Sequence, residues 1–197
     1  MALVLAAVLL ALMNQKDGYG KSLNTFAGRY IAYGTKFYNC DQTQLPTSDK
    51  PTWNWYLRFT HHFNPLKPEE LQRFDGNVTG LEEVNDNCWT RVVVDARSNN
   101  QWKENAFVFN FPGGACSAAY QHTKCFQALT GKLLSKGKTC VLNPGVSILS
   151  DTPMDWSFPY FPIMPYGEWR FRLSYGPPGQ KRASGCHIAE AVTIPKS

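Results

Sequence analysis

The feature that most constrains this chain is a two-residue alternation of large apolar and polar side chains. It recurs in four separate segments, which are residues 53–63, 90–97, 106–111 and 168–175. Successive side chains of a β-strand point to opposite faces of a sheet, so this alternation predicts strands that each bury one face. Residues 98–101 (SNNQ) lie between two of these segments and carry a hairpin turn signal.

The alternation also predicts which side chains point inward. We expect the inward rows to be formed by Trp55, Leu57, Phe59, Val92, Val94, Phe107, Phe109, Phe171 and Leu173. Only residues 117–134 have helical spacing, with apolar side chains at positions 126, 129 and 133. A chain of 197 residues usually forms one domain. The pattern therefore predicts an all-β domain, an antiparallel two-sheet β-sandwich or β-cup with one short helix.

The N-terminus is typical of a signal peptide. Residues 2–13 are all apolar, and this run is shorter than the roughly 20 residues that span a bilayer. A buried N-terminal helix is the alternative. Gly18 and Gly20 form a small-x-small pattern, so we expect a signal peptide at residues 1–20 and a single domain at residues 21–197.

Cysteine content and a glycosylation motif indicate the same compartment. The chain has six cysteines, all after residue 20, with no CxxC pair and no Cys/His zinc spacing. An even number in an exported chain predicts three disulfides. Asn77 begins an N-x-T motif after Asp75-Gly76, a turn signal, and is the expected glycosylation site. We therefore expect a secreted glycoprotein.

The sequence shows no catalytic or metal-binding motif, and we expect no enzyme activity, no metal and no cofactor. His61 and His62 are adjacent on a strand and would point to opposite faces, so we expect a core histidine followed by a surface one. The serine-hydrolase, zinc-protease and phosphate-loop spacings are absent. A hydrolase built from scattered residues stays open as an alternative. The net charge of +5 is scattered, which favours an anionic membrane surface over nucleic acid.

Residues 151–167 fit no regular element, because four prolines interrupt a strongly apolar segment. Such a loop must either cover the core as a lid or contact an apolar partner. We expect its apolar residues to form the mouth of a binding cavity and to touch membranes. These residues are Trp156, Phe158, Tyr160, Phe161 and Ile163.

Several short motifs occur in an order that resembles a known family. They are YNCD at 38–41, GNVT at 76–79, GACS at 114–117, YGEWR at 166–170 and GCHIA at 185–189. In this order the chain resembles the ganglioside GM2 activator family of the MD-2-related lipid-recognition superfamily. It is also similar to insect chemosensory relatives of that family. The set covers residues 38–194, although that family has eight cysteines and this chain has six.

The resemblance implies a β-cup around a large apolar cavity that holds the acyl chains of a lipid or glycolipid. We expect a cavity of several hundred Å³, the usual size of ligand sites. The implied role is to carry or present the lipid, in some cases to a glycolipid hydrolase in the lysosome. The alternative is a secreted chemosensory protein that binds a hydrophobic signal molecule. Family order implies disulfides Cys40–Cys186 and Cys125–Cys140, which leaves Cys88–Cys116 as the third.

Overall fold

The computed structural model describes residues 26–47, 49–136, 139–158 and 161–196, and it confirms the all-β class. The expected signal peptide at residues 1–20 lies outside the described residues. The strands are β1 (Ala27–Gly28), β2 (Tyr30–Asn39), β3 (Trp53–His61), β4 (Gln72–Gly80), β5 (Val84–Asn85), β6 (Trp89–Ser98), β7 (Gln101–Phe111), β8 (Leu134–Lys136), β9 (Cys140–Leu142), β10 (Gly145–Met154), β11 (Met164–Pro165), β12 (Gly167–Gly176) and β13 (Gly185–Pro195). The helical elements are η1 (Gln42–Gln44), α2 (Ala115–His122), α3 (Lys124–Thr130) and η2 (Gly131–Leu133).

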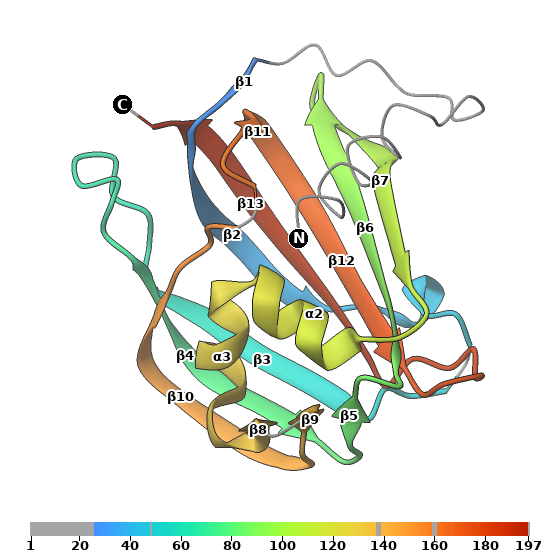
Figure 1. Ribbon diagram of the computed structural model, residues 1–197. Coiled ribbons are helices and arrows are strands. Elements are labelled where there is room, and N and C mark those ends of the chain that lie inside the picture. The colour runs from blue at the N-terminus through green and yellow to red at the C-terminus, as the bar shows by residue number, and fades with distance from the viewer. Residues whose placement is uncertain (1–25, 48, 137–138, 159–160, 197) are drawn as a thin grey trace.

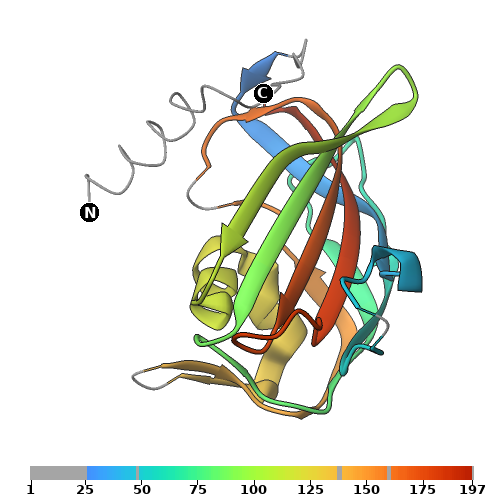
Figure 2. The same cartoon turned by 90° about the vertical axis from the view of Figure 1, so that its right-hand side faces the viewer.

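Eight of the strands form a large and a small antiparallel sheet that separate from a common junction. Of the others, β5, β9 and β8 form a three-stranded sheet, and β1 pairs with β11. The large sheet has the order β2-β13-β12-β6-β7, and the small sheet has the order β3-β4-β10. The backbone joins them through one parallel bridge, between Gly185 of β13 and Trp53 of β3. Figures 1 and 2 show the two sheets diverging, with α2 and α3 on the side of the small sheet. The expected two-sheet cup is therefore the observed architecture.

Side-chain amides connect the sheets where the backbone does not. Near the junction, the backbone N–H of Trp55 donates to Oδ1 of Asn39 at 3.1 Å. Farther along, Gln72 makes two hydrogen bonds to the backbone of Gly34, one from its Nε2 (3.0 Å) and one to its Oε1 (2.7 Å). A Cβ at position 34 would lie 2.4 Å from the Trp156 ring, so only glycine allows this close approach. These contacts set the separation of the two sheets.

The predicted single helix over residues 117–134 is wrong in detail. The structure has α2 and α3, and Thr123 between them has extended backbone angles (φ −131°, ψ 111°). The backbone N–H and the hydroxyl of Thr123 both donate to the Ala119 carbonyl oxygen, which ends α2. The predicted inner face is correct, because Phe126, Leu129 and Leu133 are all buried against the small sheet.

Buried apolar side chains form two separate clusters. The main cluster lies between the small sheet, the helices and the junction end of the large sheet, and includes Trp53, Phe74 and Phe126. The second cluster lies on the large sheet alone and consists of Val94, Ala96 and Trp169 with partly buried neighbours. Sheets that interdigitated along their whole length would share one continuous core. The inner faces therefore pack together at one end only.

Two disulfides are formed, and one matches the expected pairing. Cys40–Cys186 is confirmed, and it ties the end of β2 to the start of β13. The other bond joins Cys116 to Cys140, so the expected pairs Cys88–Cys116 and Cys125–Cys140 are wrong. Cys88 and Cys125 are free thiols. Disulfides form in oxidising compartments, which is compatible with an exported protein.

Asp86 explains why Cys116 meets Cys140. Its carboxylate accepts hydrogen bonds from the backbone N–H (2.8 Å) and the hydroxyl (2.6 Å) of Ser117 in the first turn of α2. The same carboxylate accepts from the backbone N–H of Cys140 at the start of β9 (3.4 Å). Burial alone would raise the pKa of Asp86, but these hydrogen bonds outweigh it and lower the pKa. One carboxylate therefore holds the helix start and the strand start side by side.

The two free thiols should be unreactive in the folded protein. Cys88 is buried, and burial raises the pKa of its thiol. Burial also raises the pKa of Cys125 to about 12. Because the thiolate is the reactive form, we expect no labelling by a maleimide at neutral pH and two labelled cysteines per chain after denaturation without reductant. Labelling of no cysteine in the denatured chain would restore the three-disulfide expectation.

Candidate functional site

Two cross-strand rows place six of the predicted inward residues on one face of the large sheet. Strand pairing aligns Phe171 of β12 with Val94 of β6 and Phe107 of β7. The next inward row aligns Leu173, Val92 and Phe109 in the same way. Residues paired across strands share a face of the sheet. We call the surface formed by Val92, Val94, Phe107, Phe109, Phe111, Trp169 and Phe171 the concave apolar face.

Much of the concave apolar face remains accessible. Val94 and Trp169 are buried, but Val92, Phe107 and Phe171 are only partly buried. At the free edge of the sheet, Phe109 is 36% exposed and Phe111 is 38% exposed. Phe111 and Trp169 belong to the same alternation of apolar and polar residues in the sequence. Neither is among the residues that we expected to line the cavity. The face is thus an extended apolar surface rather than closed core.

The three predicted residues from the small sheet have a different role. Trp55 is 4% exposed, and its ring stacks on the imidazole of His187 with centroids 4.3 Å apart. Leu57 and Phe59 pack against the same main cluster. Trp55 therefore belongs to the core at the closed end, because the sheets are still close together near their junction. Trp55 also borders the larger pocket described below, so its place in the wall of an acyl-chain cavity stays a prediction.

The expected mouth segment divides into a packed part and an exposed part. The Trp156 ring packs against Phe59 and Phe74 of the main cluster, with centroids 6.5 and 6.2 Å apart. Phe158 lies 5.8 Å from the Phe171 ring, so it touches the concave apolar face. The placement of Tyr160 lies outside the described residues.

Phe161 and Ile163 form the exposed part of this segment. Phe161 is 46% exposed and Ile163 is 60% exposed. The backbone N–H of Phe158 donates to the hydroxyl of Tyr30 at 3.2 Å, which attaches the segment to the start of β2. Among the expected mouth residues that the structure describes, these two side chains and Phe158 lie as a mouth requires, whereas Trp156 packs against the main cluster. Proline spacing predicted an irregular loop but could not distinguish the two parts.

A buried polar chain lies at the closed end of the cup. The His187 Nδ1 is 2.9 Å from Oδ1 of Asn39, and its Nε2 is 3.1 Å from the hydroxyl of Tyr175. Burial lowers the pKa of His187 to about 3, so its imidazole is neutral. Burial raises the pKa of Tyr175, which stays protonated. With a neutral ring, the Nδ1–H donates to Asn39 and the hydroxyl of Tyr175 donates to Nε2. The chain is fully hydrogen-bonded and carries no charge.

Asn77, the expected glycosylation site, lies on the outer face of the small sheet. It pairs with Tyr56 and Ile148, whose side chains are 61% and 74% exposed. Thr79 lies on the same face, and its hydroxyl donates to Oδ1 of Asn77 at 3.3 Å. A glycan on Asn77 would point away from the concave apolar face. Its attachment stays a prediction.

Two pockets lie near this site. The larger, of about 520 Å³, follows the line where β2 and β3 separate and includes Trp55, Leu57 and Asn77 in its lining. The smaller, of about 170 Å³, lies between the start of β2, the segment before β4 and the end of β10. Neither is lined by the residues of the concave apolar face. An enclosed acyl-chain cavity on that face stays a prediction.

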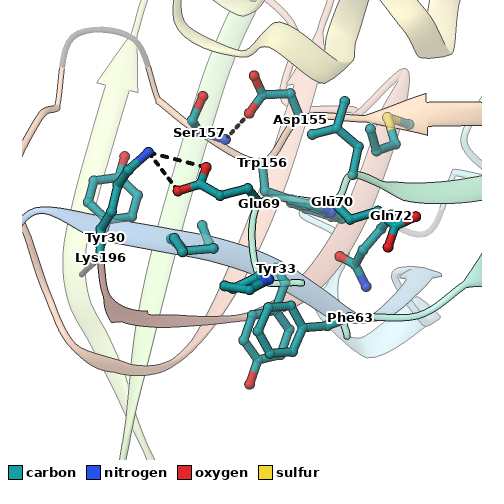
Figure 3. Close-up of a pocket in the computed structure, with 15 residues that line it drawn as sticks. Tyr30, Tyr33, Phe63, Glu69, Glu70, Gln72, Asp155, Trp156, Ser157 and Lys196 are labelled. Carbon is teal, nitrogen blue, oxygen red and sulfur yellow. Dashed lines mark hydrogen bonds and ion pairs between the residues drawn. The ribbon is translucent and has the colours of Figure 1, made fainter. Parts of the chain in front are cut away.

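We call the smaller pocket the rim pocket, and Figure 3 shows the side chains that line it. Trp156 lines it from the segment after β10, and Glu69 and Lys196 form an ion pair at its edge (3.0 Å). The rings of Tyr33 and Phe63 are stacked with centroids 3.9 Å apart on another side. Sequence reasoning missed this pocket apart from Trp156, because its walls come from segments that are distant in the chain.

The described residues show neither a metal centre nor a membrane-crossing helix. In the placed part of the chain, no group of three or more His, Cys, Asp and Glu side chains could hold a metal ion. None of its helices is long and apolar enough to cross a membrane. His61 is not a core histidine as expected: its side chain is 44% exposed and lies 3.7 Å from Glu70. A register shift between Phe59 and His61 turns it out of the core.

Comparison with known proteins provides no family assignment. No protein-family model matches the chain, and no curated protein matches it significantly.

Proposed function

We propose that this protein is a secreted, non-enzymatic lipid carrier that holds acyl chains against the concave apolar face. The observation that carries the proposal is the exposure of inward-pointing aromatic side chains on the large sheet. Phe109 and Phe111 are each more than one-third exposed on a face that an ordinary sandwich would bury. Soluble proteins rarely leave a contiguous apolar surface of this kind without a partner.

The surroundings of the face fit an apolar, chain-like ligand. Phe107 and Phe109 form one ring pair on it, with centroids 6.5 Å apart, and Phe158 and Phe171 form a second pair, with centroids 5.8 Å apart. Each methylene group transferred from water to such a surface contributes about 0.8 kcal/mol. An acyl chain therefore gains several kcal/mol of binding free energy without any polar contact. The order of the sequence motifs, which resembles a lipid-recognition family, supports the same proposal.

The exposed part of the mouth segment supports uptake from a membrane surface. Phe161 is close to the concave apolar face, because its backbone N–H donates to the carbonyl oxygen of Phe158 at 3.0 Å and Phe158 contacts Phe171. Burying one such side chain in a bilayer is worth about 1.5–3 kcal/mol, which permits transient binding and release. The net charge of +5 adds attraction to an anionic bilayer surface. Presentation of the lipid to a glycolipid hydrolase is a further role that this carrier could serve.

The direct test is to identify what the purified protein holds. We expect native mass spectrometry of the protein from a eukaryotic secretory host to show a bound lipid. We also expect the protein to move lipids from donor to acceptor phosphatidylcholine vesicles. A protein that binds no lipid and transfers none would contradict the proposal.

A pair of variants on one strand tests the site itself. Phe107→Ser with Phe109→Ser should reduce lipid transfer by about 10- to 30-fold, because two partly exposed rings lose roughly 1 kcal/mol of ligand contact each. Val108 lies between them, points to the opposite face and is 39% exposed. Val108→Ser is therefore the matched control and should leave transfer unchanged. Equal losses in both variants would show that the concave apolar face is not the binding surface.

A further inference from the structure

We infer that the glycan expected on Asn77 packs its first sugar against the outer face of the small sheet and covers an apolar patch there. The occupant is an N-acetylglucosamine attached to the Asn77 amide, and the patch consists of Tyr56 and Ile148. Because this face points out of the cup, the contact is independent of the proposed lipid carriage.

Three large apolar side chains are exposed on this outer face. Tyr56 of β3 is 61% exposed, and Val146 and Ile148 of β10 are 57% and 74% exposed. Among the described strands, β10 pairs only with β4, so it forms a free edge of the small sheet (Figure 1). Exposed apolar side chains on an unpaired edge favour association with other chains, and natural proteins usually cover or interrupt such edges. This face therefore needs a cover.

Asn77 lies at the centre of the patch. The strand pairing places it between Tyr56 of β3 and Ile148 of β10, so the three side chains are neighbours on one face of the sheet. Residues directly opposite each other in an antiparallel pair have Cβ atoms about 4.5–5.5 Å apart. A sugar attached to Asn77 therefore starts within reach of both apolar side chains.

A hydrogen bond from Thr79 sets the direction in which the sugar leaves the sheet. The Thr79 hydroxyl donates to Oδ1 of Asn77 at 3.3 Å, so Nδ2, the atom that carries an N-linked glycan, is on the side of the amide that faces away from Thr79. Val146 lies opposite Thr79, whereas Tyr56 and Ile148 lie opposite Asn77. The sugar therefore starts beside Tyr56 and Ile148 and leaves Val146 uncovered.

The larger pocket provides room for the sugar beside Asn77. Its volume is about 520 Å³, and Tyr56, Asp75 and Asn77 belong to its lining. The space next to the Asn77 amide is therefore open on the side of Tyr56. There the C–H groups of the sugar ring can lie on the phenol ring and remove apolar surface from water, while the sugar hydroxyls stay hydrated.

The test compares three forms of the protein that differ in the sugar at position 77. The chain is expressed in a secretory host that attaches high-mannose glycans, and one portion is treated with endoglycosidase H, which leaves a single N-acetylglucosamine. The third form is Asn77→Gln, which has no glycan. We expect the first two forms to share one Tm and Asn77→Gln to melt about 2–4 °C lower, a shift of the size that one lost contact produces in a chain of this length. Thr79→Ala also lacks the glycan and should show the same loss.

Two variants locate the contact, and Val146→Ser is their matched control. The Tm difference between the glycosylated protein and Asn77→Gln is measured again in the presence of Tyr56→Ser or Ile148→Ser. Each substitution should reduce this difference by about half, because it removes one side of the contact. Val146→Ser should leave the difference unchanged, because Val146 is exposed on the same strand and face as Ile148 but lies opposite Thr79. In the form with one sugar, NMR should show NOEs from the N-acetylglucosamine to the Tyr56 ring.

Several results would overturn the inference. They are an unmodified Asn77 in the secreted protein, equal Tm values with and without the sugar, or a one-sugar form that melts with Asn77→Gln. An effect of Val146→Ser equal to that of the two patch variants, or the absence of NOEs to Tyr56, would overturn it as well. If the unglycosylated variants are not secreted, the NOEs decide. A dimer of the glycosylated protein that Ile148→Ser dissociates would assign the patch to a second copy of the chain instead.

Discussion

Replacing Cys40 and Cys186 with alanine is expected to lower the free energy of unfolding by about 5 kcal/mol. The two cysteines are separated by 146 residues, so the disulfide removes a large amount of chain entropy from the unfolded state. The bond also lies at the junction of the two sheets, where the backbone N–H of Cys40 donates to the Cys186 carbonyl oxygen at 3.0 Å. There β13 leaves β2 and makes its single bridge to β3. Urea unfolding followed by tryptophan fluorescence measures the loss.

The second disulfide is the matched control for this prediction. Cys116 and Cys140 are separated by only 24 residues, so their replacement by alanine should cost about 3–4 kcal/mol by the same entropy argument. The long-loop variant should therefore be less stable than the short-loop variant by roughly 1–2 kcal/mol. The opposite order would show that native contacts around Asp86, rather than loop length, determine the contribution of each bond.

Acidification is expected to destabilise the protein through His187 before the carboxylates titrate. The pKa of His187 is about 3 in the folded protein, against 6.5 for an ordinary histidine. Between pH 6.5 and pH 3, the His187 imidazole therefore binds a proton in the unfolded chain but not in the folded chain. The full stability is present above pH 6.5 and is lost as the pH falls towards 3. The total loss at pH 3 is about 4 kcal/mol, since one pKa unit corresponds to about 1.4 kcal/mol.

Measurements between pH 7 and pH 4.5 isolate this effect. Glu82 receives a bidentate hydrogen bond from Arg182, which lowers its pKa to about 2, so its contribution is lost only below the ordinary value of 4.5. Urea unfolding at several pH values should show stability falling from pH 6.5 downward. An NMR titration should show the His187 imidazole still neutral at pH 4.5. His61→Gln with His62→Gln is the control, and a pH slope that disappears in this variant would contradict the assignment to His187.

The strands and their inward sides could be predicted from the sequence. The alternation around Phe107, Phe171 and Val94 depends on the local geometry of an extended chain, in which neighbouring side chains point to opposite faces. The observed rows bring these residues together as expected. The pairing of Cys40 with Cys186 agrees with the order implied by the family resemblance.

Contacts between distant segments were decided by the tertiary structure. The alternation identifies the inner side of each strand but not how far apart two sheets lie. The sequence therefore could not show that Trp55 and Trp156 pack against the core, whereas Phe158 contacts the accessible face. The separation depends on the bridge at Gly185 and on the amide of Gln72, whose partner is 38 residues away in the chain.

The same distinction applies to the disulfides and to the rim pocket. Cysteine spacing leaves the partner of Cys116 open, and the carboxylate of Asp86 decides it by binding the starts of α2 and β9. The rim pocket combines Tyr30, Glu69 and Trp156 from three segments, none of which carries a motif. Local periodicity determined the strands and their buried faces, because these depend on neighbours in the chain. Only the packing of distant segments decided the accessible face and the pocket, because no local pattern encodes the distance between two sheets.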